Sequence, residues 1–173
     1  MLKEHDIFLL IGGNQGNRKK YLDESSILID KKIGKIIKKS SFFKSEGWKM
    51  KKNTPYFLNQ IINIKTFCSP ISLMDKIKKI ENSIEKKSEI ITYKNKRIYK
   101  NRKIDIDILF YDQLIIYTSN LNLIIPHYLF HLRKFILIPM CEINPNKLHP
   151  VFKMTILEIL GSCSDNSIVK KFL

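Results

Sequence analysis

Two aspartates, Asp105 and Asp107, alternate with isoleucines in segment 102–110. Such alternation is typical of a strand with one buried face and one polar face. Both carboxylates would then project from the same surface, roughly 6.6 Å apart along the strand. Because Asp is disfavoured in strands and like charges repel, a divalent cation, or a pair of them, would stabilise the arrangement. The alternative is a solvated edge strand whose charges prevent aggregation.

Three further features could carry chemistry, and each has a structural alternative. Loop 12–17 is rich in glycine and could bind phosphate, but it matches neither the P-loop nor the dinucleotide-binding pattern, so a tight turn is the simpler interpretation. Glu81 lies on or near the apolar side of a predicted helix, either as a salt-bridged structural residue or as a ligand-facing one. His127 follows a proline in a loop, where a histidine is more often structural.

The formal net charge of +15 raises the question of a nucleic-acid partner. Of the 31 basic residues, 27 are Lys and four are Arg, and the chain also holds 30 Ile and 13 Asn. This joint excess is typical of an A- and T-rich coding bias, whereas specific phosphate and base contacts favour Arg. A ferredoxin-like nucleic-acid binder would also present aromatic residues on its central strands. We therefore expect a solvated lysine-rich surface and no nucleic-acid partner.

The length of 173 residues predicts a single domain, 1–173, with residues 161–173 as a polar tail. No apolar run approaches the length of a membrane span, and the first residues lack the pattern of a signal peptide. The three cysteines show no metal-binding spacing and indicate free thiols in a reducing compartment. We expect a cytoplasmic, stand-alone monomer with no membrane partner.

The apolar pattern predicts the element order β-α-β-β-α-hairpin-β, followed by helices. The expected strands are 5–11, 36–44, 57–67 and 102–110, and the expected helices are 19–32 and 70–86. A hairpin is expected in 88–99, a short helix near 131–135 that ends before Pro139, a loop at 142–150 and a last helix at 154–160. This order predicts an α+β fold of the ferredoxin-like, split βαβ type, with an antiparallel sheet and helices packed mainly on one face.

Seven motifs follow one another in an order that resembles a known family. They are a Gly-x-Asn loop, a Ser-Glu-Gly-Trp loop, a Phe-Leu-Asn strand, a helix ending in Glu, an Arg-x-x-Asp-x-Asp strand, Pro-His-Tyr and Arg-x-Phe. From about residue 7 to residue 160, the chain resembles the 6-hydroxymethyl-7,8-dihydropterin pyrophosphokinases, folate-pathway enzymes with a ferredoxin-like fold. Asp105-x-Asp107 alone is a weak signal, whereas the seven motifs together are specific.

The resemblance implies an ATP- and magnesium-dependent transfer of pyrophosphate to the hydroxymethyl oxygen of the pterin, with release of AMP. By matching positions, it implies catalytic roles for Arg102, Asp105, Asp107 and Lys86, with two Mg²⁺ ions on Asp105 and Asp107. It implies ATP contacts from Lys78, Glu81, Arg102, Ile108, His127, Tyr128 and Arg133. It implies a pterin site of Gly12, Ser45, Trp48, Phe57, Asn59 and Phe135. A Phe on a strand is ordinarily a core residue, but Phe57 shares its face with Asn59 and Lys65, which favours a semi-polar pocket.

The chain departs from the family pattern after the second predicted helix. Where the family has Gly-Arg-x-Arg, this chain has Glu85-Lys86-Lys87-Ser88, and the following segment is about six residues longer than is usual in the family. Lysine is a point charge and not a planar fork, so we expect a slower enzyme unless Arg97 supplies the missing guanidinium. Gly13 stands where Ser is common, and Phe43 where Tyr is usual. The alternative function is a catalytically impaired remnant that binds pterin or ATP.

Overall fold

The computed structural model describes residues 3–51, 53–85, 101–118 and 123–173. The hairpin expected in 88–99, together with Lys86 and Arg97, lies outside these residues. Among the described helices, none combines the length and the apolar character that a membrane crossing requires.

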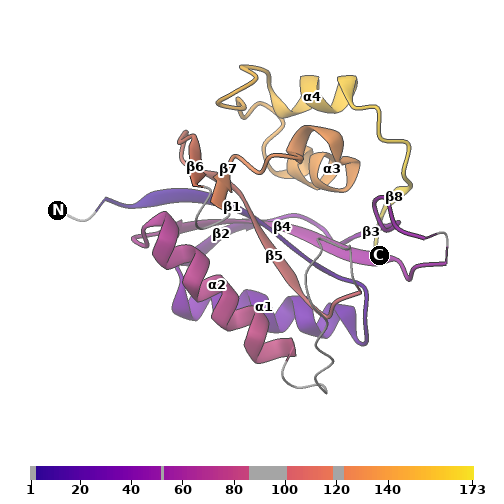
Figure 1. Ribbon diagram of the computed structural model, residues 1–173, viewed down its shortest axis with the longest axis horizontal. Helices are drawn as coiled ribbons and strands as arrows, with labels where there is room; N and C mark the ends of the chain where they lie inside the picture. Colours follow the sequence, from indigo (N-terminus) through magenta and orange to yellow (C-terminus); the bar gives the residue numbers. More distant parts are fainter. Residues whose placement is uncertain (1–2, 52, 86–100, 119–122) are drawn as a thin grey trace.

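An antiparallel sheet organises the fold, in the order β5-β1-β4-β3-β8, and its strand β1 (His5–Gly13) lies between β5 and β4 (Figure 1). Strand β1 pairs with β4 (Phe57–Thr66) on one side and with β5 (Asp105–Tyr111) on the other. Strand β4 in turn pairs with β2 (Lys35–Lys39) and β3 (Phe43–Ser45), and β3 pairs with β8 (Val169–Lys171). A separate hairpin is formed by β6 (Ile116–Thr118) and β7 (Leu123–Ile125).

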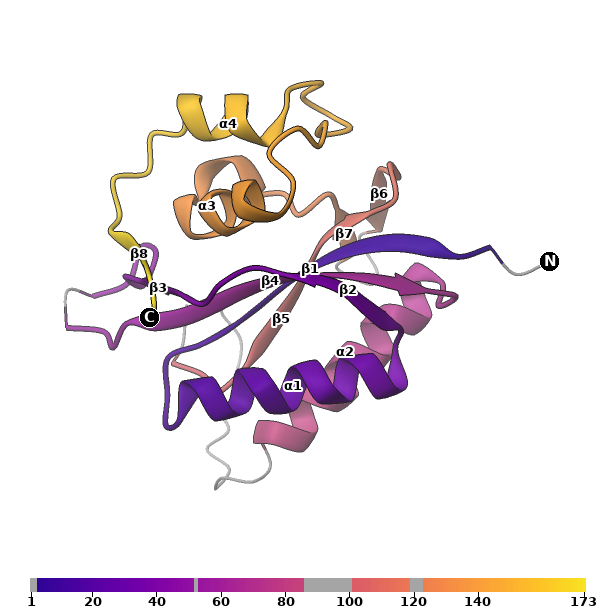
Figure 2. The same ribbon diagram turned by 180° about the vertical axis from the view of Figure 1, so that it is seen from behind.

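Helices lie on both faces of the sheet (Figures 1 and 2). The long helices α1 (Arg18–Lys32) and α2 (Pro70–Glu85) pack on one face, and the shorter α3 (Lys134–Ile143) and α4 (Ile156–Ser162) lie over the other. Strand β1 supplies both cores, because Ile7, Leu9 and Ile11 pack toward α1 and α2 while Phe8 and Leu10 pack toward α3 and α4. The α+β, split βαβ architecture is confirmed, with both long helices on one face.

Two expected boundaries were wrong. The strand predicted at 36–44 is split into β2 and β3, which pair with different parts of β4, and the pairing of β2 with β4 contains an irregularity between Ile36 and Lys38. The helix predicted to end before Pro139 continues to Ile143, so α3 takes up the start of the expected 142–150 loop. An interior proline costs roughly 3 kcal/mol. Burial of Leu137 and Met140 against the sheet offsets that cost.

Strand β5 keeps the predicted alternation over its first half and then changes register. Ile104 and Ile106 pack into the core beneath α1 and α2, and Asp105 and Asp107 face the opposite way. Leu9 pairs with Ile108 whereas Phe8 pairs with Phe110, so Leu109 is the extra residue of a β-bulge. The bulge ends the polar stripe just beyond Asp107.

Residues 161–173, expected as a polar tail, include a short strand. Strand β8 pairs antiparallel with β3, with Val169 opposite Ser45 and Lys171 opposite Phe43. A 3₁₀ turn, η1 (Phe130–Leu132), leads directly into α3 and thereby fixes the place of Arg133 between the two.

A capping box closes the N-terminus of α4 and provides a test of the local assignment. The hydroxyl of Thr155 accepts from the backbone N–H of Glu158 at 3.2 Å, and the Glu158 carboxylate accepts from the N–H of Thr155 at 2.7 Å. We expect Thr155→Ala to lower the free energy of unfolding by about 1 kcal/mol, because the N–H of Glu158 loses its acceptor and the Glu158 carboxylate loses the hydroxyl donor. Urea denaturation measures this loss; an unchanged midpoint would contradict the assigned cap.

Candidate active site

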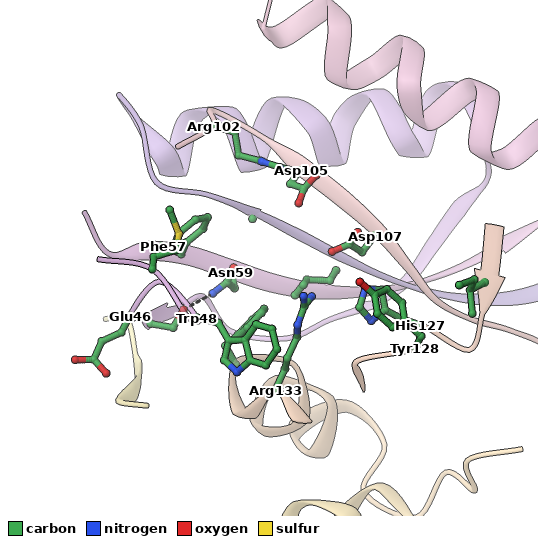
Figure 3. Close-up of a pocket in the computed structure, with 16 residues that line it drawn as sticks. Glu46, Trp48, Phe57, Asn59, Arg102, Asp105, Asp107, His127, Tyr128 and Arg133 are labelled. Atoms are coloured by element: carbon green, nitrogen blue, oxygen red, sulfur yellow. Dashed lines mark hydrogen bonds and ion pairs between the residues drawn. The ribbon is translucent and has the colours of Figure 1, made fainter. Parts of the chain in front are cut away.

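A pocket of about 400 Å³ opens on the sheet face toward α3, at the end where β3, β4, β1 and β5 lie side by side (Figure 3). Its walls come from segments far apart in the sequence: the sheet, the loop after β3, the segment before α3, and β7. The lining residues are Leu10, Gly12, Ser45, Glu46, Trp48, Met50, Phe57, Asn59, Arg102, Asp105, Asp107, Ile124, His127, Tyr128, Arg133 and Phe135.

One end of the pocket is acidic and is bordered by guanidinium groups. Asp105 and Asp107 both face the cavity from β5, and Arg102 forms an ion pair with Asp105 (Figure 3). Burial, and then the neighbouring Asp107, raise the pKa of Asp105 to about 6, although its side chain remains 36% exposed through the pocket mouth. Burial also raises the pKa of Asp107, opposed by Arg133 and then Arg102. The two carboxylates therefore repel each other in surroundings that solvate them poorly.

The two carboxylates fit a metal ion whose remaining coordination positions are filled by a bound substrate. Among the described residues, no group of three or more His, Cys, Asp or Glu side chains forms a metal site. Magnesium in kinase-type sites is held by one or two carboxylates together with substrate phosphates, so a full protein cage is not required. A cation between Asp105 and Asp107 would relieve the repulsion that raises their pKa values.

Two glutamates of α2 support the strand that carries the aspartates. In the described part of the chain, β5 is an edge strand with β1 as its strand neighbour, which leaves backbone donors without a ladder partner. Glu81 accepts from the N–H of Ile106 at 2.7 Å, between the two aspartates in sequence. Glu85, one helical turn later, accepts from the N–H of Lys103 at 2.9 Å. These carboxylates take the place of a strand partner and hold β5 against α2.

The glycine loop is tied to the segment that precedes β5. Asn14 is buried, and its Oδ1 accepts from the N–H of Arg102 at 3.0 Å while its own N–H donates to the Arg102 carbonyl at 2.9 Å. A Cβ at Gly13 would collide with the Lys103 carbonyl, so this close approach requires glycine. The loop therefore positions Arg102. Asn14, the asparagine of the Gly-x-Asn motif, is a structural determinant of the acidic end, a role that the sequence analysis did not assign to it.

The opposite end of the pocket is aromatic and amide-lined. Asn59 is buried on β4, and its Nδ2 donates to the Ser45 hydroxyl at 2.8 Å. A Cβ on Gly12 would strike the Asn59 side chain, so glycine at this position keeps the amide in place. Phe57 lines the same end. This arrangement can hold a flat polar ring between aromatic faces, with amide groups at its edge.

Arg133 connects the two ends of the pocket. Its guanidinium carbon lies 4.7 Å from the centroid of the Trp48 ring and 5.6 Å from that of Phe135, both within cation–π range (Figure 3). The same residue lowers the pKa of Asp107, so its positive charge also acts at the acidic end. Because Arg133 is 7% exposed, water screens this charge weakly.

His127 and Tyr128 stand at the rim as a stacked pair. Their ring centroids are 5.3 Å apart with an interplanar angle of 26°. Burial, and then Arg133, lower the pKa of His127 to about 4, so its imidazole is neutral at pH 7. A neutral imidazole contributes a hydrogen bond and no charge to a bound anion.

Most of the residues expected at a site come together here, and three of the described ones do not line the pocket. Lys78 is exposed on α2, Ile108 packs against the core on the other face, and Glu81 lies behind β5. Lys86 lies outside the described residues. Four lining residues were missed by sequence reasoning: Leu10, Glu46, Met50 and Ile124. Leu10 shares a strand face with Gly12, and that period of two was the available signal.

A family model described as 7,8-dihydro-6-hydroxymethylpterin-pyrophosphokinase (HPPK) matches residues 8–145 of this chain. The chain belongs to this family. The 2-amino-4-hydroxy-6-hydroxymethyldihydropteridine pyrophosphokinase of Aquifex aeolicus is 32% identical over 152 residues, which cover 88% of each protein. The protein of the same name from Haemophilus influenzae is 31% identical over 135 residues, 78% of each.

Solved structures of HPPK-DHPS proteins share the fold. A Plasmodium falciparum HPPK-DHPS double mutant, crystallised with pterin and p-hydroxybenzoate, aligns with a TM-score of 0.72 at 19% identity. Another HPPK-DHPS, in complex with substrates, aligns with a TM-score of 0.68 at 17% identity. The alignments cover 92% of this chain but 43% of each solved chain, so this chain spans less than half the length of those proteins.

Against the HPPK pattern, Glu85 is a departure with a structural consequence. It stands where the resemblance places glycine, and glycine cannot accept a hydrogen bond through a side chain. The Glu85 carboxylate instead binds the backbone just before β5. The substitution thus adds a contact between the end of α2 and the strand that carries the aspartates.

The protonation of Glu81 predicts an unusual pH dependence of stability. Burial, and then Asp105, raise its pKa from 4.5 to about 7. The folded state therefore holds this proton more tightly than the unfolded chain. The stabilisation that results is complete below pH 4.5 and is lost as the pH rises through 7. Glu81→Gln keeps an acceptor for Ile106 and removes the titration.

We expect the free energy of unfolding of the wild type to fall between pH 5 and pH 8, and that of Glu81→Gln to fall less steeply. Urea denaturation at several pH values, without nucleotide or metal, measures both slopes. Asp105, whose pKa is also raised, lowers the free energy of unfolding over the same direction of pH change. Because both proteins retain Asp105, the difference between their slopes reports Glu81. Parallel slopes would show that Glu81 does not titrate in this range.

Proposed function

We propose that this protein transfers the pyrophosphoryl group of ATP to the hydroxymethyl group of 6-hydroxymethyl-7,8-dihydropterin and releases AMP, as a transferase of folate biosynthesis. The observation that carries the proposal is the two-ended pocket, with paired aspartates and arginines at one end and an aromatic, amide-lined slot at the other. Membership of the HPPK family and the names of its relatives support the same reaction.

The acidic end would receive the triphosphate together with its metal. An ATP-using kinase of this family employs a metal cofactor in general, and we propose Mg²⁺, as two ions, held by Asp105 and Asp107. Bound Mg²⁺ would neutralise charge on the phosphate oxygens. Arg102 and Arg133 border the same space and offer planar guanidinium groups to phosphate oxygens, a geometry that lysine lacks.

The rim residues would bind the nucleotide. His127 and Tyr128 can donate to phosphate or ribose oxygens, and His127 does so as a neutral group because its pKa is about 4. Ile124 extends the apolar lining beside them. Lys78 and Ile108 do not line this pocket, so any nucleotide contact from them would lie outside its walls.

The aromatic end would hold the pterin. Phe57 and Phe135 would stack on the ring, and Asn59 would bond its polar edge while Ser45 fixes the orientation of the amide. Trp48, whose ring is held beside Arg133, would close the outer side. The pterin hydroxymethyl group would then point toward Asp105 and Asp107.

The proposed reaction is an in-line displacement at the β-phosphorus. The hydroxymethyl oxygen forms the new bond to phosphorus, the bond from that phosphorus to the oxygen bridging to the α-phosphate breaks, AMP leaves, and the hydroxyl proton passes to solvent. The protein acts mainly by positioning and by electrostatic stabilisation, which is most of what phosphoryl-type transfer requires. Burial of Asp107 and Arg133 strengthens those interactions.

The remaining expectations stay predictions. The described cysteines, Cys68, Cys141 and Cys163, are free thiols, which supports a reducing compartment and hence the cytoplasm. A monomer without nucleic-acid or membrane partners remains our expectation. The impaired pterin- or ATP-binding remnant has no observation in its favour, because the replaced loop residues Lys86 and Lys87 lie outside the described residues.

The test is AMP release from ATP and Mg²⁺, with and without 6-hydroxymethyl-7,8-dihydropterin. We expect pterin-dependent AMP from the wild type and a loss of at least about a hundred-fold in kcat/KM for Asp107→Ala, because the Mg²⁺ that would neutralise the phosphate charge then loses one of its proposed ligands. Asp23→Ala, which removes an exposed carboxylate of α1 outside the pocket, is the matched control and keeps the activity.

Pterin binding without AMP release in the wild type would contradict the enzyme and favour the impaired remnant. Absence of both pterin binding and AMP release would overturn the function altogether. Single-turnover kinetics measure the transfer step separately and test the expectation that the replaced loop arginines slow it.

A further inference from the structure

The last residues of the chain connect two walls of the pocket. We call residues 165–172 the C-terminal strap; they lie outside the 8–145 range that matches the HPPK family model. Figure 2 shows the strap running from α4 past α3 to the outer edge of the sheet beside β3. Family membership therefore assigns no role to this segment, and its contacts need an explanation of their own.

The first contact is at the N-terminus of α3. The Asp165 carboxylate accepts from the backbone N–H of Lys134 at 2.8 Å, and its other oxygen accepts from the N–H of Ser167 at 3.0 Å. Arg133, at the N-cap position of α3, makes no side-chain capping bond, so Asp165 supplies the cap from a distant part of the chain. This cap anchors the residue next to Arg133, which lines the pocket.

The second contact is at the opposite wall. Strand β8 pairs with β3, with Val169 opposite Ser45. Beyond the end of β3, the N–H of Ile168 donates to the Glu46 carboxylate at 3.0 Å, and the N–H of Glu46 donates to the Ile168 carbonyl at 3.3 Å. Ser45 and Glu46 both line the pocket, and Ser45 bonds Asn59.

A third contact ties the strap to the far end of α3. The Lys171 ammonium lies 2.8 Å from the Glu142 carboxylate, which also accepts from the backbone N–H of Ser41 at 2.8 Å. The N–H of Phe172 donates to the Phe42 carbonyl at 2.7 Å. The strap is thus attached to α3 near both of its ends and to the chain on either side of β3.

We propose that the C-terminal strap is a positioning element of the pterin end of the pocket. It sets the separation between the β3 wall, which carries Ser45 and Glu46, and the α3 wall, which carries Arg133 and Phe135. Strand β3 has three residues, and without β8 it would be a short sheet edge beside the loop that carries Trp48. The strap pre-organises the slot and so reduces the ordering cost of ring binding. This inference rests on the proposed function.

A purely structural strap would give a different pattern of effects. Loss of a stabilising segment lowers the free energy of unfolding and leaves the affinity of the folded molecules unchanged. Loss of a positioning element weakens pterin binding in molecules that remain folded, while the phosphate end of the pocket keeps its affinity. Pterin and ATP affinities, measured separately in folded protein, therefore distinguish the two roles.

The experiment compares the full chain, a deletion of residues 165–173, Asp165→Ala and Lys171→Ala. Trp48 is the only tryptophan of the sequence and lines the slot, so quenching of its fluorescence reports binding of 6-hydroxymethyl-7,8-dihydropterin. The Mg²⁺–ATP affinity is measured in parallel by calorimetry. Thr155→Ala, which removes a helix cap on α4 away from the pocket, is the matched control for a loss of stability.

We expect the deletion to raise the pterin Kd about ten-fold, and Asp165→Ala to raise it about three-fold, with the ATP affinity within about two-fold of wild type. In the AMP assay the pterin KM should rise with the Kd while kcat at saturation stays within about two-fold. Thr155→Ala should leave both affinities unchanged.

An unchanged pterin Kd in folded Asp165→Ala and Lys171→Ala would overturn the proposal, as would an equal loss of ATP and pterin affinity. If the deleted chain does not fold, the two point variants carry the test. Failure of the wild type itself to bind pterin would overturn the proposed function instead, so the two failures are distinguishable.

Discussion

The central physical constraint in this molecule is the mutual repulsion of Asp105 and Asp107 on a partly buried stretch of β5. Burial and this repulsion together raise the pKa of Asp105 to about 6, which is unfavourable for an empty site and favourable for one that receives a cation. Two side-chain contacts hold β5 in place against this repulsion. Glu81 bonds the backbone between the aspartates, and Arg102 pairs with Asp105.

The pocket depends equally on contacts between distant parts of the chain. Its acidic end is fixed by α2 and the glycine loop, whereas its aromatic end is fixed by the pairing of Ser45 with Asn59 and by the position of Arg133 beside Trp48. The same guanidinium lowers the pKa of Asp107, so the charge balance of the metal end depends on a residue mounted at the start of α3. Arg133 therefore contributes to both ends of the pocket.

Two positions at which the sequence departs from the family pattern lie against the segment that carries Arg102. Glu85 replaces a glycine and gains bonds to the backbone before β5, and Gly13 replaces a serine at a place where a Cβ would meet the Lys103 carbonyl. The segment that carries Arg102 is thus tied down from two sides, by the loop at Asn14 and by the end of α2.

The sequence by itself determined the split βαβ order of elements along the chain, the two long helices and the facing aspartates, because period-two and period-3.6 apolar patterns are local and strong. Its motif order also identified the family and most of the residues that line the pocket. Only the tertiary structure decided that α3 continues through Pro139, that Glu81 supports β5 from behind, and that the last residues form β8 against β3. These outcomes depend on burial against a distant core, or on a backbone donor that needs a partner from elsewhere, and neither leaves a local pattern in the sequence.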